Sequence, residues 1–116
     1  MKKLLLFIAL GLFLVNVSFA QEVKPSFEKQ NDLVKATYFY EDGQIKEVGF
    51  FKDDKLHDKW ISYDKTGKVK VVANYENGMK EGTWYITGEN SVKVVTYKSN
   101  RVVKVEEVDE LEESLI

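Results

Sequence analysis

The stretch Tyr75-Glu-Asn-Gly-Met-Lys-Glu-Gly-Thr-Trp84 repeats, in divergent form, the earlier stretch Phe51-Lys-Asp-Asp-Lys-Leu-His-Asp-Lys-Trp60. In both stretches an aromatic residue is followed by a polar two-residue turn and then by a tryptophan. Gly43 precedes Trp60 by 17 residues, and Gly67 precedes Trp84 by 17 residues. The repeat period is therefore 24 residues, from residue 60 to residue 84. A fixed period of this length indicates a repeat array, in which each unit buries its apolar side chains against its neighbours.

Short runs rich in Val, Ile, Tyr, Phe and Thr continue on both sides of these stretches and alternate with turn residues, which is the pattern of strands and hairpins. The expected strands are Lys35 to Tyr40, Gln44 to Phe51, Lys55 to Tyr63, Lys68 to Tyr75, Met79 to Thr87, Ser91 to Tyr97 and Arg101 to Val105. No helical period lasts long enough to supply the crossover that parallel strands need. The sequence therefore predicts an all-β fold: an antiparallel meander of about seven short strands in stacked β-hairpin repeats, forming an elongated sheet.

Strict alternation along the strands assigns the side chains to two faces of this sheet. One face is expected to hold Ile45, Gly49, Phe51, Val69, Val71, Ala73 and Tyr75, and the other Lys46, Lys68, Lys70, Val48, Val72 and Val94. A small residue beside a large aromatic in two units suggests that a tryptophan covers the backbone there. We expect Trp60 near Gly49 or Ala73. We likewise expect Trp84 near Ala73 or Val95.

The unit Tyr75–Trp84 resembles the MORN-type repeat, in the variant that reads aromatic, one residue, Asn-Gly, three residues, Gly, one residue, Trp. The sequence from Tyr63 to Gly67 resembles the linking turn of that variant. The resemblance covers about Tyr38 to Val105, with one good unit and two degenerate ones. It implies stacked hairpins in an elongated β-sheet. The roles that it implies are protein–protein scaffolding, lipid binding and neutralisation of a toxin partner.

The start of the chain is typical of a secretory signal peptide, residues 1–20. Met1-Lys2-Lys3 is basic, Leu4 to Val17 is almost wholly apolar, and Ser18-Phe19-Ala20 offers small residues for cleavage before Gln21. The alternative is an N-terminal membrane anchor, but the apolar run is shorter than the about 20 residues of a spanning helix. We expect an exported protein, periplasmic or extracellular, with no membrane span after cleavage.

Three further segments follow the signal peptide: a polar linker (21–33), a MORN-like β-repeat domain (34–105) and an acidic tail (106–116). The carboxylates of the tail are Glu106, Glu107, Asp109, Glu110, Glu112 and Glu113. Its apolar residues Val108, Leu111 and Leu115 fit one face of a short helix. A disordered acidic tail is the other interpretation, and the like charges favour it.

The composition of residues 21–116 excludes several classes of function. Without Lys2 and Lys3 the chain has 15 basic and 19 acidic groups, so it lacks the basic field that nucleic-acid binding needs. It has no cysteine and a single histidine, His57, so no Cys/His zinc site can form and no disulfide supports the fold.

The motifs of catalytic and cofactor sites are missing from the sequence. A hydrolytic triad would need His57 with Ser62 or Ser91, and neither serine lies in a Gly-x-Ser-x-Gly elbow. Asp53-Asp54 lacks the spaced ligands of a calcium loop. No glycine-rich phosphate loop occurs. We therefore expect no catalytic, cofactor-binding or metal-binding residue and no enzyme activity.

Two functions remain open from the sequence. The first is a non-enzymatic β-repeat module that binds another protein or an envelope component. The second is an aromatic platform for glycans or cell-wall fragments. The aromatic residues available for such a platform are Trp60, Trp84, Tyr38, Tyr40, Phe50, Phe51, Tyr63, Tyr75 and Tyr85. Aromatic residues at repeat spacing also suit the core between units, and this is the interpretation that we favour.

Overall fold

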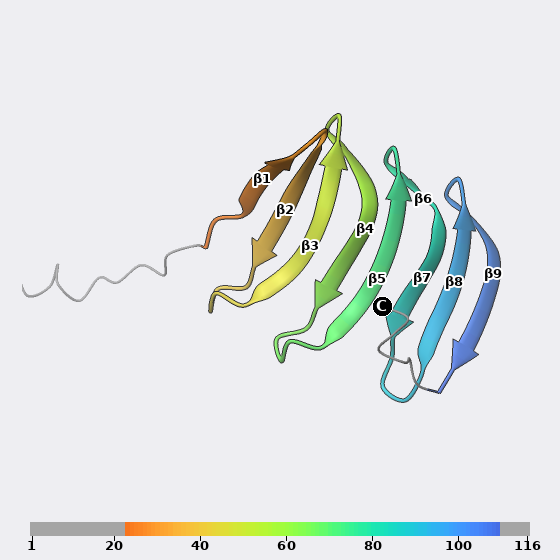
Figure 1. The fold of residues 1–116 in the computed structure, drawn as a ribbon. Helices are drawn as coiled ribbons and strands as arrows, with labels where there is room; N and C mark the ends of the chain where they lie inside the picture. The colour runs from red at the N-terminus through yellow and green to blue at the C-terminus, as the bar shows by residue number, and fades with distance from the viewer. Residues whose placement is uncertain (1–22, 110–116) are drawn as a thin grey trace, which may run out of the picture.

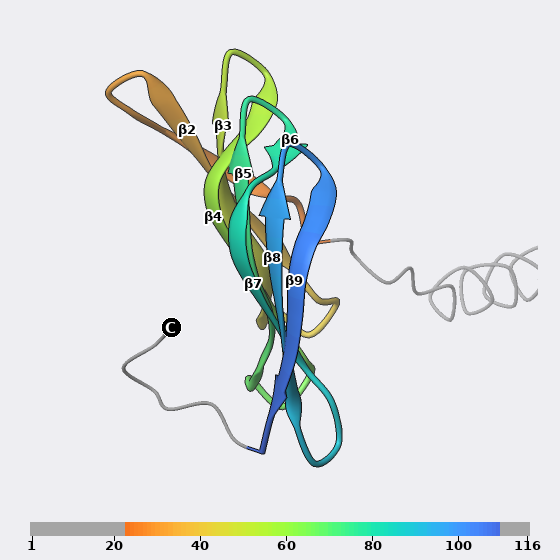
Figure 2. The same cartoon turned by 90° about the vertical axis from the view of Figure 1, so that its right-hand side faces the viewer.

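The computed structural model describes residues 23–109, which form a single antiparallel sheet without helices (Figure 1). The strands are β1 (Ser26–Gln30), β2 (Leu33–Phe39), β3 (Ile45–Lys52), β4 (Lys55–Tyr63), β5 (Val69–Glu76), β6 (Met79–Lys80), β7 (Gly82–Thr87), β8 (Val92–Lys98) and β9 (Arg101–Val108). They lie in the sheet in chain order, with the short β6 paired to β5. Seen from the side, the sheet is one twisted layer (Figure 2).

The predicted all-β meander of hairpins is confirmed. The seven expected strands correspond to β2 through β9, because the run from Met79 to Thr87 is interrupted at Glu81 and forms both β6 and β7. Every pair of neighbouring strands is antiparallel.

The structure differs from the expected boundaries at both ends of the repeat domain. Residues 26–30 of the expected linker form β1, which a two-residue turn with Asn31 at φ 57° joins to β2. Phe27 of β1 packs edge-on against Tyr38, with 6.2 Å between ring centroids, and this contact holds a polar strand on the sheet. At the other end β9 runs to Val108, so the acidic segment begins inside the sheet. The expected signal peptide and residues 110–116 of the tail lie outside the described residues.

Three hairpin tips, which lie at the same end of the strands, have the same backbone geometry. In each tip both central residues have positive φ, as a type I′ turn requires. These pairs are Asp53 and Asp54 (49° and 63°), Asn77 and Gly78 (51° and 84°), and Ser99 and Asn100 (49° and 70°). Each later tip also bonds to the hairpin before it, since Gly78 N donates to Leu56 O (2.8 Å) and Asn100 N to Lys80 O (3.0 Å).

Each tryptophan lies beside an interruption of the strand ladder. Val48 pairs with Ile61 but Phe50 pairs with His57, so three residues of β4 face one of β3. The ladder between β5 and the pair β6 and β7 has the same two-residue excess. Asp58 and Gly82, which are one repeat period apart, accommodate it with φ of 64° and 73°. Because two residues are added, alternation resumes on the same face.

The indole N–H groups satisfy backbone carbonyls at these interruptions. Nε1 of Trp60 donates to Phe50 O (2.9 Å), and Nε1 of Trp84 donates to Asn74 O (3.0 Å). Donor and acceptor are both displaced by one repeat period, so the repeat extends to single hydrogen bonds.

The tryptophan rings form the core, as predicted. Trp60 and Trp84 are only 4% and 7% exposed. Trp60 pairs with Ala73 and also covers Gly49, where an added Cβ would lie 1.9 Å from the ring. Trp84 pairs with Val95. We call the side of the sheet that carries these rings the tryptophan face, and the side that carries Phe50 and Tyr85 the second face.

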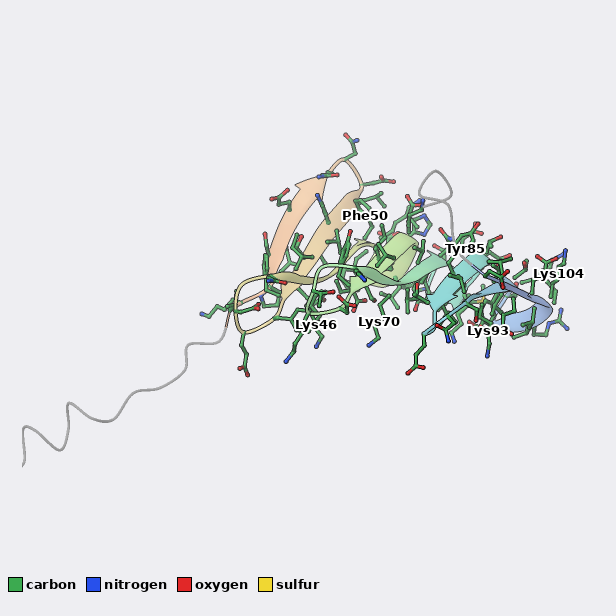
Figure 3. All side chains as sticks on the ribbon, turned by 90° about the horizontal axis from the view of Figure 1, so that it is seen from below. Lys46, Phe50, Lys70, Tyr85, Lys93 and Lys104 are labelled. Atoms are coloured by element: carbon green, nitrogen blue, oxygen red, sulfur yellow. The ribbon has the colours of Figure 1, made fainter. Side chains whose placement is uncertain are left out.

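Part of the predicted face assignment is wrong. A one-residue shift between Tyr38 and Phe39 makes Ile45 pair with Phe39, and an equivalent shift makes Val69 pair with Tyr63. Ile45 and Val69 therefore join the second face. Lys46 and Lys70, the extra residues of these bulges, point to the same side as Lys93 and away from Phe50 and Tyr85 (Figure 3). The expected placement of Val48, Val72 and Val94 on the second face is confirmed by their row, which runs from Val48 through Ile61, Val72 and Tyr85 to Val94.

The close approach of Trp60 to Gly49 generates a testable prediction. The variant Gly49→Ala is expected to destabilise the fold by about 1–3 kcal/mol, because the new methyl group displaces the ring from its position. Urea unfolding followed by circular dichroism measures the loss. The matched background is Trp60→Leu, in which the same Ala substitution should cost clearly less. An equal cost in both backgrounds would show that the ring is not the cause.

Candidate binding surfaces

His57, the only histidine, has a structural position beside a hairpin tip. Its Nδ1 accepts a hydrogen bond from Asn77 N (3.3 Å). Glu81 occupies the same position one repeat period later, and its Oε2 accepts from Ser99 N (2.8 Å). An imidazole and a carboxylate thus perform the same task, which is to accept the N–H of the first turn residue of the following hairpin.

The residues considered for a triad do not come together. Ser62 pairs with Glu47 and Val71 on the tryptophan face, whereas His57 pairs with Phe50 on the second face. Ser91 directly precedes β8, which lies three strands from the β4 strand of His57, and its hydroxyl donates to Glu107 Oε1 (2.6 Å).

Asp53 and Asp54 form the tip of the hairpin between β3 and β4. Both have positive φ, so the turn explains the presence of two aspartates without a metal ion. Within residues 23–109 no three His, Cys, Asp or Glu side chains gather as a metal site would require.

The aromatic residues expected as a platform divide into two groups. Trp60 is enclosed by Tyr38 and Phe51, at centroid distances of 6.4 and 5.1 Å. Trp84 is enclosed by Tyr75 and Tyr97, at 5.2 and 5.1 Å. The ammonium group of Lys80 lies 5.0 Å above the Trp84 ring and 5.2 Å above Tyr97, at the position that Leu56 occupies in the unit before. The indoles are therefore core residues whose rings cannot stack on a ligand.

The environment of Tyr75 agrees with this packing. Burial raises the pKa of the Tyr75 hydroxyl, and the nearby Glu47 and Tyr97 raise it further. The phenol thus remains neutral beside the Trp84 ring and belongs to the core rather than to an ionisable site.

An open groove of about 760 Å³ lies on the tryptophan face at its N-terminal end. Three aromatic side chains and several charged ones line it: Phe27, Tyr38, Phe51, Lys29, Asp32, Asp53 and Asp54. Phe27 is 58% exposed. Phe27 was not predicted as a surface residue from the sequence, because it is the single apolar residue of Ser26–Gln30 and one apolar residue makes no strand pattern.

A strip of apolar side chains crosses the second face. Its central row is Val48, Ile61, Val72, Tyr85 and Val94, and Phe50 lies beside it. Apart from Val72, these side chains are only half-buried, because no second layer of described residues covers them. Phe50 and Tyr85 point to the same side, as Figure 3 shows.

Charge is divided between the strands and the turns of the sheet. The strands carry 12 basic and six acidic side chains, whereas the other residues of 23–109 carry three basic and nine acidic ones. The strip on the second face is bordered by Lys35, Lys59, Lys98 and Lys104 and by two carboxylates, Glu28 opposite Lys35 and Glu106 opposite Val94. A chain of negative total charge thus presents apolar and basic faces between acidic turns.

Comparison with protein-family models, with curated proteins and with solved structures gives no match. Residues 23–109 contain no helix that is long and apolar enough to cross a membrane.

The equivalence of His57 and Glu81 generates a testable prediction. His57→Ala is expected to lower the free energy of unfolding by about 0.5–1.5 kcal/mol, since the N–H of Asn77 loses its acceptor. His57→Glu introduces the acceptor of the next unit and should retain most of the stability. Urea titration of both variants at neutral pH measures the difference. If His57→Glu is as unstable as His57→Ala, the hydrogen bond to the tip does not stabilise the array.

Proposed function

We propose that this protein is an exported, non-enzymatic β-repeat module, periplasmic or extracellular, that binds another protein or an envelope component. The observation that supports the proposal best is the apolar strip on the second face. Its binding surface is this strip, with Phe50 and Tyr85 as the large side chains available to a partner.

The architecture favours an external partner. A sheet gains stability by burying its apolar side chains against another layer, and stable domains consist of two or more such layers. Here the tryptophan rings and their neighbours cover one face. Among the described residues, the strip from Val48 to Val94 packs only against adjacent side chains of the same sheet. A contiguous apolar surface with a polar border is typical of interaction sites.

The border of the strip favours a partner of a particular charge. The lysines Lys35, Lys59, Lys98 and Lys104 outnumber the carboxylates Glu28 and Glu106 around it, so a surface with an apolar centre and a mainly acidic border is complementary. Tyrosine and phenylalanine are common anchors in such interfaces because they bury a large area with few rotatable bonds. Nucleic acid is not proposed, since the turns of the sheet are acidic.

The remaining parts of the proposal rest on the sequence. The separation of His57 from Ser62 and Ser91 supports a non-enzymatic role. The signal-like residues 1–20 support export. Membership of the MORN-type repeats is proposed from the unit Tyr75–Trp84, and the displacement of the indole hydrogen bonds by one period supports a true repeat.

Site-specific photocrosslinking in the native cell tests the proposal. Phe50 and Tyr85, and Phe27 of the groove, are each replaced by a photoreactive phenylalanine analogue, and Lys46, on the other side of the sheet from Phe50, serves as the control position. We expect a defined protein adduct from Phe50 and Tyr85 and none from Lys46. Failure of both second-face positions to form an adduct, while Phe27 forms one, would contradict the proposal and transfer the binding site to the groove.

The groove supports a second candidate function, the aromatic platform for glycans or cell-wall fragments. Its aromatic walls, Tyr38 and Phe51, pack directly on Trp60, so the tryptophan reports on the groove without contacting a ligand. Titration with soluble cell-wall fragments is expected to change the fluorescence of the wild type. The variant Phe27→Ser should lose that response, and Tyr85→Ser, on the second face, should keep it. No change in the wild type with any fragment would exclude this function.

A further inference from the structure

The strand β9 leaves one side of its backbone without a strand partner among residues 23–109. All eight of its residues are exposed, and Figure 2 shows the strand along the front edge of the sheet. Unpaired N–H and C=O groups on such an edge form a template for another strand. The charges and apolar side chains of β9 decide which partner strand can pair with this edge.

The array ends at β9 without the residue that closes the earlier units. Trp60 and Trp84 cover the strands before them, but here Val105 occupies the equivalent place opposite Val95. The ladder between β8 and β9 shifts by one residue instead of two, which turns Glu106 to the second face beside Val94. Val105 remains 57% exposed, so the tryptophan face ends in an open apolar border.

The order of charges along β9 is self-complementary. Arg101 and Lys104 lie in its first half, and Glu106 and Glu107 lie in its second half. When two such strands run antiparallel about a two-fold axis, the basic half of each lies opposite the acidic half of the other. We propose that β9 is a homodimer interface that pairs with β9 of a second copy of this chain.

Symmetry and charge together define the register. A two-fold axis perpendicular to the sheet keeps each face on its own side, so a residue must lie opposite one of the same face. Pairing centred on Lys104 would oppose two lysines, and pairing centred on Glu106 would oppose two glutamates, both of which are unfavourable. Pairing centred on Val105 opposes Val105 to its own copy and Lys104 to Glu106 twice.

From Lys104 to Glu106 the register centred on Val105 also agrees with the faces of the sheet, whereas beyond the bulge at Val103 the faces of Val102 and Val108 differ. Lys104 and Glu106 pair with Thr96 and Val94, so both lie on the second face, where they already form an ion pair at 3.0 Å within one chain. The dimer shares these charges between two copies. The Val105 pair lies on the tryptophan face and covers the open apolar border of both arrays.

Charges and bulges on edge strands commonly prevent association. Charge does not protect β9 in the register centred on Val105, because opposite charges meet there. The bulge of β9 at Val103 limits the matched segment to the residues around Val105. The other edge strand, β1, has five residues against eight in β9, so it offers less backbone to a partner.

The absence of cysteine from the chain makes a symmetric disulfide a direct test. Opposed residues on antiparallel strands have Cβ atoms about 4.5–5.5 Å apart, close to disulfide range. Val105→Cys is therefore expected to form a covalent dimer under mild oxidation. Val102→Cys and Phe27→Cys are the matched controls, and each should remain mainly monomeric. Equal dimer yields from all three variants would overturn the proposed register.

A charge swap tests the interface without any covalent bond. Analytical ultracentrifugation of the wild type from about 1 µM to about 1 mM is expected to show a monomer–dimer equilibrium. Lys104→Glu and Glu106→Lys each create two like-charged pairs and should raise the dissociation constant about tenfold. The double variant restores both pairs and should return it close to the wild-type value.

Two outcomes of the ultracentrifugation would overturn the proposal. One is a wild type that remains monomeric throughout the concentration range. The other is a dimer whose dissociation constant is the same in both single variants as in the wild type. Circular dichroism of each variant confirms that the sheet is intact, so that a lost dimer is not mistaken for a lost fold.

Discussion

The packing of a tryptophan ring over a small residue, with its indole N–H on a backbone carbonyl, is the interaction on which the sheet depends. Trp60 covers Gly49 and Ala73, and bonds to Phe50 O across a two-residue irregularity in the ladder. Without the indole, the chain would have an exposed carbonyl and an uncovered backbone at the same point. The ring therefore closes its own hairpin through the hydrogen bond and packs on the next hairpin through Ala73, and one side chain supplies what a second layer provides in a sandwich.

The two faces of the sheet are consequently unlike. The tryptophan face is closed by rings and lysine ammonium groups and ends in an open border at each side, formed by Phe27 and Val105. The second face has a valine and isoleucine row, with Phe50 and Tyr85 as its large members. Most of the buried side chains lie on the tryptophan face, and apart from Val72 and Val92 the second face stays partly exposed.

The sequence was sufficient to predict the strands, the tips and the position of the rings, because those features depend on local patterns. Asn77-Gly78 and Asp53-Asp54 specify turns by their tolerance of positive φ, and Gly49 and Ala73 reveal the rings by their small size. The one-residue bulges at Lys46 and Lys70 could not be predicted, since they depend on how β2 and β4 align with their neighbours. A single extra residue reverses every later side chain, and so Ile45 and Val69 were assigned to the wrong face. The groove was missed because β1 is polar except for Phe27, and it is held by the Tyr38 ring from another strand.

The hydrogen bonds from Gly78 to Leu56 and from Asn100 to Lys80 give the array a direction, because each tip rests on the hairpin that precedes it in the chain. Only backbone atoms take part, so any hairpin of the same geometry can use the acceptor that the previous one offers. Duplication of one whole repeat unit can therefore lengthen the sheet while the backbone hydrogen bonds between successive tips are kept. Arrays of this kind can grow or shrink by whole units during evolution, while β9, the last strand of residues 23–109, is free to acquire a surface of its own.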